Sequence, residues 1–338
     1  DYELGNYIAY WDYTGYGYYF PTTHQQTVTV MALTSISIES DKDVIVGETF
    51  GFSGRIIDDM DEPLSTELNF YFHGQFVDTL LTDGDGKFYY EYKVPTDSNA
   101  GPNAISVHYI SEGFYRASSS TWQLQVYHNT RIVMDDSEGI LDTTVPIVGY
   151  AYDKADRPIS NLSIRLVLDS GFPIDGITDN NGKFTIPLPL PFGLELGNHN
   201  LTATFAGNDY YITNFTTSKI HIKGETQIFL DIPNSLEYQQ SYSGAISLRM
   251  YDGTPVSGAS LLVKLEPEGI TFMVITDLNG TANFDSVFSG NMTIPMVVKV
   301  TYTGSENYIG NEIESTIVYR PPVEQSNYSF WIVMAASL

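Results

Sequence analysis

The sequence predicts an all-β protein built from consecutive sandwiches of one type, and three observations lead to that prediction. A short motif with aromatic residues at both ends, six positions apart, occurs four times at intervals of 96, 96 and 97 residues. Apolar and polar residues alternate in the segments beside it, as in half-buried strands. No long segment has helical apolar spacing, and tyrosine, which favours strands, is abundant at 25 residues.

The aromatic motif sets the size of the repeated unit. Its copies are Tyr13-Thr-Gly-Tyr-Gly-Tyr-Tyr19, Tyr109-Ile-Ser-Glu-Gly-Phe-Tyr115, Phe205-Ala-Gly-Asn-Asp-Tyr-Tyr211 and Tyr302-Thr-Gly-Ser-Glu-Asn-Tyr308. Such a period indicates an array of one domain type. It matches the roughly 100-residue immunoglobulin-like sandwich, which is large enough to bury its own core. We expect the second aromatic residue to pack at the corner before the last strand.

Two turn signals recur with the same period. The first reads Thr82-Asp-Gly-Asp-Gly-Lys87, Thr178-Asp-Asn-Asn-Gly-Lys183 and Thr276-Asp-Leu-Asn-Gly-Thr281. Because Asp-Gly and Asn-Gly supply the positive φ of tight turns, and apolar runs flank them, each copy predicts a β-hairpin. The second is a proline after a polar stretch, at Pro63, Pro158 and Pro255, which predicts a turn linking two strands.

These signals divide the chain into five parts. Residues 33–128, 129–223 and 224–320 are predicted to be complete immunoglobulin-like units. Residues 1–32 contain only the last two strands of a preceding unit, or strands donated elsewhere, because an isolated hairpin is marginal in water. Residues 321–338 form a linker and a possible start of a membrane anchor. The nine apolar residues at 330–338 are too few to span a bilayer, and a last strand or a disordered end are the alternatives.

Composition excludes several classes of function. The chain has 41 acidic and 16 basic residues, a net charge of −25 that repels nucleic-acid backbones and favours solubility. It has no cysteine, so disulfides, thiolate metal sites and a cysteine nucleophile are excluded.

The sequence predicts no catalytic and no cofactor-binding residue. None of the six histidines has metal-ligand spacing, and the nucleophile-elbow, phosphate-loop and dinucleotide motifs are missing. Calcium is the one metal with weak candidates. Oxygen ligands cluster at Asp58, Asp59, Asp61 and Glu62, with a smaller group in the first turn, but solvated turns are the competing interpretation.

Glycosylation and carbohydrate binding are two further hypotheses. Sequons occur at Asn161, Asn200, Asn214, Asn279, Asn291 and Asn327. They are typical of an extracytoplasmic protein in an organism that N-glycosylates, an archaeon or a eukaryote. The aromatic cluster Tyr16, Tyr18, Tyr19 and Phe20 could stack on sugars, against the simpler interpretation that motif tyrosines pack in the fold.

The turn at 178–183 and the motif at 302–308 resemble those of prokaryotic immunoglobulin-like repeat domains of cell-surface proteins. The resemblance covers nearly the whole chain, and one unit departs from it with Ser111 in place of glycine. It implies an extracellular, elongated, non-catalytic array. Such domains serve as stalks, adhesins, surface-layer components and enzyme spacers, so the resemblance is specific for fold and weak for function.

The leading hypothesis is therefore a structural or adhesive surface protein, tethered near its C-terminus. Its expected partners are further copies of itself, cell-surface proteins or glycans. In one variant it is a filament subunit, in which the strands of residues 1–32 complete the sheet of a neighbouring copy. The alternative is a spacer or carbohydrate-binding region of a larger extracellular enzyme.

Overall fold

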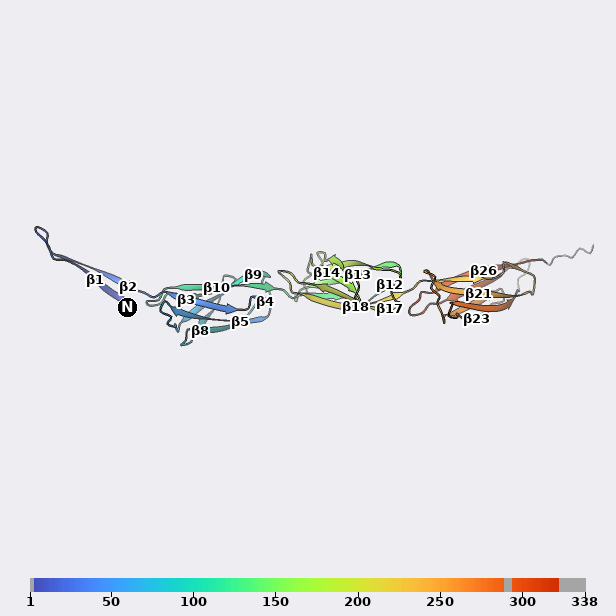
Figure 1. Ribbon diagram of the computed structural model, residues 1–338, viewed down its shortest axis with the longest axis horizontal. Helices are drawn as coiled ribbons and strands as arrows, with labels where there is room; N and C mark the ends of the chain where they lie inside the picture. The colour runs from blue at the N-terminus through green and yellow to red at the C-terminus, as the bar shows by residue number, and fades with distance from the viewer. Residues whose placement is uncertain (1–2, 289–293, 322–338) are drawn as a thin grey trace, which may run out of the picture.

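The protein is a rod of three β-sandwiches in line, preceded by a two-stranded hairpin (Figure 1). The computed structural model describes residues 3–288 and 294–321, and within them it contains strands and no helix. The hairpin consists of β1 (Gly5–Tyr13) and β2 (Thr22–Val30) and extends from one end of the rod. The fold class expected from the repeat, tandem immunoglobulin-like sandwiches in an elongated array, is confirmed.

Unit 1 packs a three-stranded sheet, in the order β3-β5-β8, against a five-stranded sheet, in the order β4-β10-β9-β6-β7. All neighbours are antiparallel except β4 and β10, which are parallel. The strands are β3 (Thr34–Ser40), β4 (Asp43–Ile45), β5 (Thr49–Asp58), β6 (Glu67–Phe72), β7 (Gln75–Leu81), β8 (Lys87–Lys93), β9 (Gly101–Tyr109) and β10 (Ser118–Tyr127).

Units 2 and 3 repeat this topology strand for strand. Unit 2 contains β11 (Arg131–Met134), β12 (Ser137–Ile140), β13 (Thr143–Tyr152), β14 (Ser163–Leu168), β15 (Ile174–Ile177), β16 (Lys183–Leu190), β17 (Gly197–Phe205) and β18 (Asn214–Lys223). Unit 3 contains β19 (Thr226–Asp231), β20 (Ser235–Leu236), β21 (Ser241–Met250), β22 (Ser260–Glu266), β23 (Ile270–Ile275), β24 (Thr281–Val287), β25 (Met296–Tyr302) and β26 (Asn311–Tyr319).

Each unit buries its own core between its two sheets, as the alternation predicts. In β9, Ile105 and Val107 are fully buried, and Leu201 of β17 and Val298 of β25 occupy the equivalent place in units 2 and 3. In the three complete units the second aromatic residue of the motif is partly buried against the core, as expected for a corner, whereas Tyr19 of the first copy is exposed. Three separate cores explain why the chain forms a rod and not a single globule.

The prediction of a β-hairpin at each Thr-Asp turn is wrong. In unit 1 the turn at 82–87 joins β7, at the edge of the five-stranded sheet, to β8, at the edge of the three-stranded sheet. The equivalent turns of units 2 and 3 also cross between sheets. A tight turn and two alternating strands look the same in sequence whether the second strand pairs with the first or crosses to the opposite sheet.

Candidate functional site

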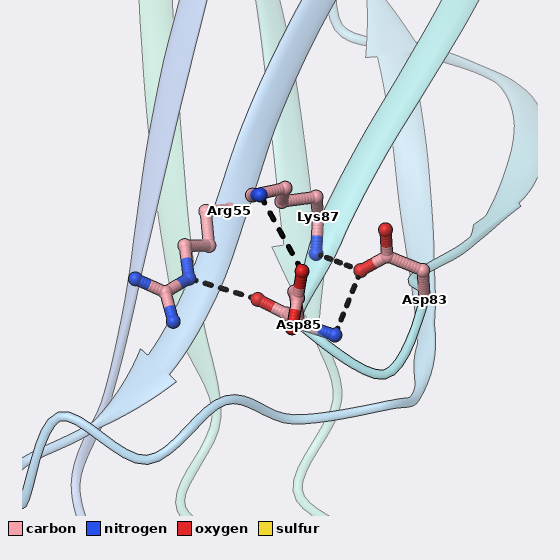
Figure 2. A network of polar contacts seen from close by, with 4 residues as sticks. All are labelled: Arg55, Asp83, Asp85 and Lys87. Carbon is pink, nitrogen blue, oxygen red and sulfur yellow. Dashed lines mark hydrogen bonds and ion pairs between the residues drawn. The ribbon is translucent and has the colours of Figure 1, made fainter.

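The Thr-Asp turn is a structural clamp in all three units. The carboxylate of Asp83 accepts hydrogen bonds from the backbone N–H groups of Asp85 and Lys87, at 2.9 and 2.8 Å (Figure 2). In unit 1 the Nε of Arg55 on β5 also donates to the carbonyl oxygen of Asp85 at 2.8 Å. The equivalent aspartates of units 2 and 3 accept the same pairs of backbone bonds. These backbone hydrogen bonds stabilise the turn, and they account for the recurring aspartate without a bound ligand.

The threonine at the start of this turn is hydrogen-bonded to the loop that follows Pro63, Pro158 or Pro255 in its unit. Thr82, Thr178 and Thr276 expose only 6%, 2% and 4% of their surface. In unit 1 the Thr82 hydroxyl donates to the carbonyl oxygen of Leu64 and accepts from the N–H of Thr66, both at 2.7 Å. The same two bonds recur in the other units. The repeated threonine is therefore a buried hydrogen-bonding group that joins two loops, each of which connects one sheet of the sandwich to the other.

The acidic cluster at 58–62, the weak calcium candidate of the sequence, also belongs to a turn. The buried carboxylate of Asp58 accepts hydrogen bonds from the backbone N–H groups of Met60 and Glu62, both at 2.9 Å. Asp59, Asp61 and Glu62 are exposed on the turn. Over residues 3–288 and 294–321, no three acidic or histidine side chains gather closely enough to hold a metal ion. Calcium binding by these residues stays a prediction.

The aromatic motif encloses the linker that enters each unit, an arrangement we call the linker clasp. Before unit 1, the N–H of Ala32 donates to the carbonyl oxygen of Phe114 at 2.9 Å, and the N–H of Arg116 donates back to Ala32 at 3.0 Å. This pair of bonds forms a short parallel bridge between Ala32 and Tyr115. The motif of a unit therefore holds the chain segment that connects it to the unit before.

The same clasp occurs at the other two linkers. His128 donates to the Tyr210 carbonyl at 2.8 Å and accepts from Ile212 at 3.1 Å. Gly224 donates to the carbonyl of Asn307 and accepts from Ile309, both at 2.9 Å. Sequence reasoning missed this role, because the bonds use only the backbone and the three linker residues differ. The one signal in the sequence is the nearly constant separation, 83 or 84 positions, between the linker residue and the motif tyrosine that it bridges.

Side chains reinforce the two joints between complete units. The Gln125 side-chain amide donates to the carbonyl oxygen of Asp209 across the first joint. At the equivalent position of the second joint, Nε2 of His221 donates to the Glu306 carbonyl at 2.9 Å. Met250 of unit 3 packs against the cores of both units 2 and 3. The joints therefore combine backbone, polar and apolar contacts.

His199 of unit 2 and His128 of the linker before it have pKa values shifted in opposite directions. Burial on its own lowers the pKa of His199, but the hydrogen bonds to the Asp169 carboxylate at 2.7 Å and the Glu195 carbonyl at 2.8 Å raise it overall. Burial, followed by the charge of Arg157, lowers the pKa of His128. The local contacts of each imidazole therefore account for its pKa shift. Neither histidine has a second histidine at metal-ligand spacing in the sequence.

The structure places four of the six sequons. Asn161, Asn200 and Asn279 are exposed, and Asn214 is partly buried at the start of β18. Asn291 and Asn327 lie outside the described residues. Asn161 has a positive φ of 57° at a turn, and Asn279 donates its backbone N–H to the turn aspartate Asp277. Use of these sites as glycan acceptors stays a prediction.

The hairpin leaves its aromatic side chains in solvent. Tyr16, Tyr18, Tyr19 and Phe20 are 76% exposed or more. In register, β1 and β2 match the last strand pairs of the complete units: Ala9 faces Gln26 as Ile105 faces Trp122. Trp11, however, is 52% exposed, whereas its counterpart Val107 is fully buried. The hairpin therefore has the form of a last strand pair without the sandwich that would cover it.

Comparison with known proteins supports the fold alone. No protein-family model matches the sequence, and no characterised protein matches it at the sequence level. Among solved structures, the ICAM-5 D1–D4 ectodomain fragment aligns with a TM-score of 0.50 at 11% identity, over 94% of this chain and 84% of that chain. The I67–I69 I-band fragment of titin aligns with a TM-score of 0.47 at 9% identity, over 85% of this chain and 99% of that chain. The ICAM-5 likeness agrees with tandem immunoglobulin-like domains.

Within residues 3–288 and 294–321, no helix has the length and apolar character needed to cross a bilayer. The segment expected to begin an anchor, residues 330–338, lies outside the described residues.

Proposed function

We propose that this chain is a non-catalytic extracellular rod that serves as a structural or adhesive element of a cell surface, as a stalk, a surface-layer component or a filament subunit. The linker clasp carries the proposal. Two backbone hydrogen bonds at every linker hold consecutive units in line, a geometry that favours reach and spacing. The resemblance to prokaryotic surface repeats and the acidic surface, which keeps neighbouring rods apart in solution, agree with it.

Small-angle X-ray scattering of the full chain tests the rod. We expect a long, narrow distance distribution that matches units in line. A matched variant with a flexible Gly-Ser insertion after Asn129 breaks the clasp register between units 1 and 2, and should broaden the distribution. A compact particle, or a distribution that the insertion leaves unchanged, would contradict the proposal.

Surface location needs its own test. An epitope tag on the loop between β14 and β15, displayed by the source cell, should be accessible to antibody and to added protease on intact cells. Labelling only after the cells are lysed would overturn the extracellular assignment.

A filament built by strand complementation is the second candidate, and the uncovered hairpin favours it. Each complete unit already contains its own last strand pair. The hairpin of a neighbouring copy would therefore add to a free sheet edge, or complete a unit that lacks its pair, and would cover Trp11 and Val28 as their counterparts are covered.

Deletion of residues 1–32 separates these possibilities. The truncated chain should keep its three units, seen as an unchanged far-ultraviolet circular dichroism spectrum per residue, and should lose self-association in light scattering. Filaments that persist after the deletion would refute strand complementation and leave the rod proposal intact. Binding of the hairpin to a glycan array, lost on substituting Tyr18 and Phe20, would instead favour the carbohydrate-binding role.

A further inference from the structure

A cavity of about 270 Å³ lies at the joint between units 1 and 2. Its charged or titratable lining residues come from both units and from the linker: Lys93, His128, Asp153, Lys154 and Arg157. Lys93 ends β8 of unit 1, and the last three belong to the turn before the proline of unit 2. The cavity therefore forms only while the two units are docked, a common location for ligand sites.

The charge of this cavity opposes that of the whole chain. Three permanent cations, Lys93, Lys154 and Arg157, face a single carboxylate, in a protein with a net charge of −25. That carboxylate, Asp153, is buried and already bound by the N–H groups of Ala155 and Arg157 and by the Arg157 Nε at 2.7 Å. The charge of Asp153 is thus satisfied within its own turn, and the net positive charge remains on the cavity wall.

The two lysines are not engaged elsewhere. Among residues 3–288 and 294–321, neither Lys93 nor Lys154 forms an ion pair. The Arg157 side chain donates through Nε to Asp153, and its two terminal nitrogens make no hydrogen bond within the same residues. His128 also lines the cavity and is partly buried, and its burial, with the charge of Arg157, lowers the pKa of the imidazole.

The equivalent joints of the same chain lack this charge. The turn of Lys154 and Arg157 corresponds to that of Asp59 and Glu62 in unit 1 and to that of Tyr251 and Thr254 in unit 3, because the same backbone bond closes all three turns. At the joint between units 2 and 3, a cavity of about 200 Å³ in the equivalent place is lined by Asp142 and Glu225 and by no cation. The basic lining is therefore particular to one joint and is not a property of the fold.

We propose that the joint between units 1 and 2 binds a small oxyanion, a sulfate, phosphate or carboxylate group, between Lys93 of one unit and Lys154 and Arg157 of the next. A lysine is a strong point charge for such groups, and the terminal nitrogens of Arg157 offer paired donors. The walls of a partly enclosed cavity strengthen these interactions relative to open solvent. This assignment goes beyond the rod proposal, because it gives one joint a ligand.

Nuclear magnetic resonance titration of the full chain tests the site. Sodium sulfate and sodium glucuronate serve as probes, with sodium chloride at matched ionic strength as the control. We expect saturable shifts of the backbone signals of His128 and Lys154 with at least one probe. Whichever probe binds more tightly identifies the preferred group, sulfate or carboxylate.

Variants decide whether the cations are responsible. Lys93→Gln and Lys154→Gln should each weaken binding by about fivefold, because each removes one charge from a partly solvated site. Lys219→Gln, an exposed lysine on β18 without an ion pair among the described residues, makes the same change of charge elsewhere and should leave binding unaltered. Shifts that do not saturate, that chloride reproduces, or that survive both cavity variants at full affinity would overturn the proposal.

Discussion

Replacing Thr82 by valine should lower the free energy of unfolding of unit 1 by about 2–4 kcal/mol. Valine keeps the shape of the side chain, but it cannot donate to the carbonyl of Leu64 or accept from the N–H of Thr66, and both bonds measure 2.7 Å. A buried backbone group that loses its partner costs about 1–3 kcal/mol. Two backbone groups lose a partner, so the total cost would be about 2–6 kcal/mol. The bond to Thr66 is only partly buried, and we therefore expect a loss in the lower part of that range.

Tryptophan fluorescence during urea unfolding measures this loss in unit 1 alone. Trp122 packs against the core of unit 1, and the only other tryptophans are Trp11 and Trp331. With both replaced by phenylalanine, the remaining signal reports on unit 1. For a unit of this size the urea slope is about 1–1.5 kcal/mol per molar, so a loss of about 2–4 kcal/mol should lower the midpoint by roughly 1.3–4 M.

Two control variants isolate the hydroxyl. Thr82→Ser keeps both hydrogen bonds and loses one buried methyl group, which costs about 1 kcal/mol. Thr121→Val, on an exposed position of β10, tests the effect of valine on a strand and should change stability by less than about 0.5 kcal/mol. Equal losses for Thr82→Val and Thr82→Ser would refute the reasoning, since the hydrogen bonds would then contribute nothing.

Three further results are expected. Gly182→Ala should lower the free energy of unfolding, measured by calorimetry, by at least about 3 kcal/mol, because φ is +70° and a Cβ would lie 2.5 Å from a backbone oxygen. Gly253→Ala, at φ +88° with no atom within 4 Å of the Cβ, should lower it by only about 1–2 kcal/mol. Equal losses for the two variants would contradict the clash. In an imidazole titration His199 should have a pKa above the ordinary value of about 6.5 and His128 one below it. His199 therefore stabilises unit 2 below about pH 6.5, and this contribution is lost as pH rises through its raised pKa, while protonation of His128 destabilises the fold as pH falls below about 6.5; a reversed order of the two pKa values would disprove both assignments. His221→Ala should widen the distance distribution in X-ray scattering without changing the melting temperatures, and an unaltered distribution would show that its bond across the joint is dispensable.

The repeat made the architecture predictable, and particular residues show why. Ile105 and Val107 lie two positions apart, and only a strand with one buried face explains that spacing along with its return 96 residues later. The turn at 82–87 resembles a hairpin in sequence because the local residues determine only the φ angles and the polarity of the turn. Whether β8 pairs with β7 or crosses to the other sheet depends on its pairing with β5, which carries Arg55. That pairing joins residues far apart in the sequence, so no local pattern reveals it.

The joints were harder to predict than the units. The linker clasp uses backbone groups of Ala32, His128 and Gly224, three residues with no chemistry in common. The basic cavity brings Lys93 together with Lys154, which are far apart in sequence and lie in a chain rich in acidic residues. Neither feature has a local pattern, because both exist only once two separately folded units meet.

The position of the clasp has a consequence for how such a chain can grow. Every clasp is made by the linker and the unit that follows it, so a duplicated segment running from one linker to the next carries the parts of its own junction. Lengthening the gene by whole periods would then extend the molecule in fixed steps of one sandwich, with no redesign of older boundaries. A cut within a period would separate a linker from its motif and leave a strand pair without the sandwich that covers it.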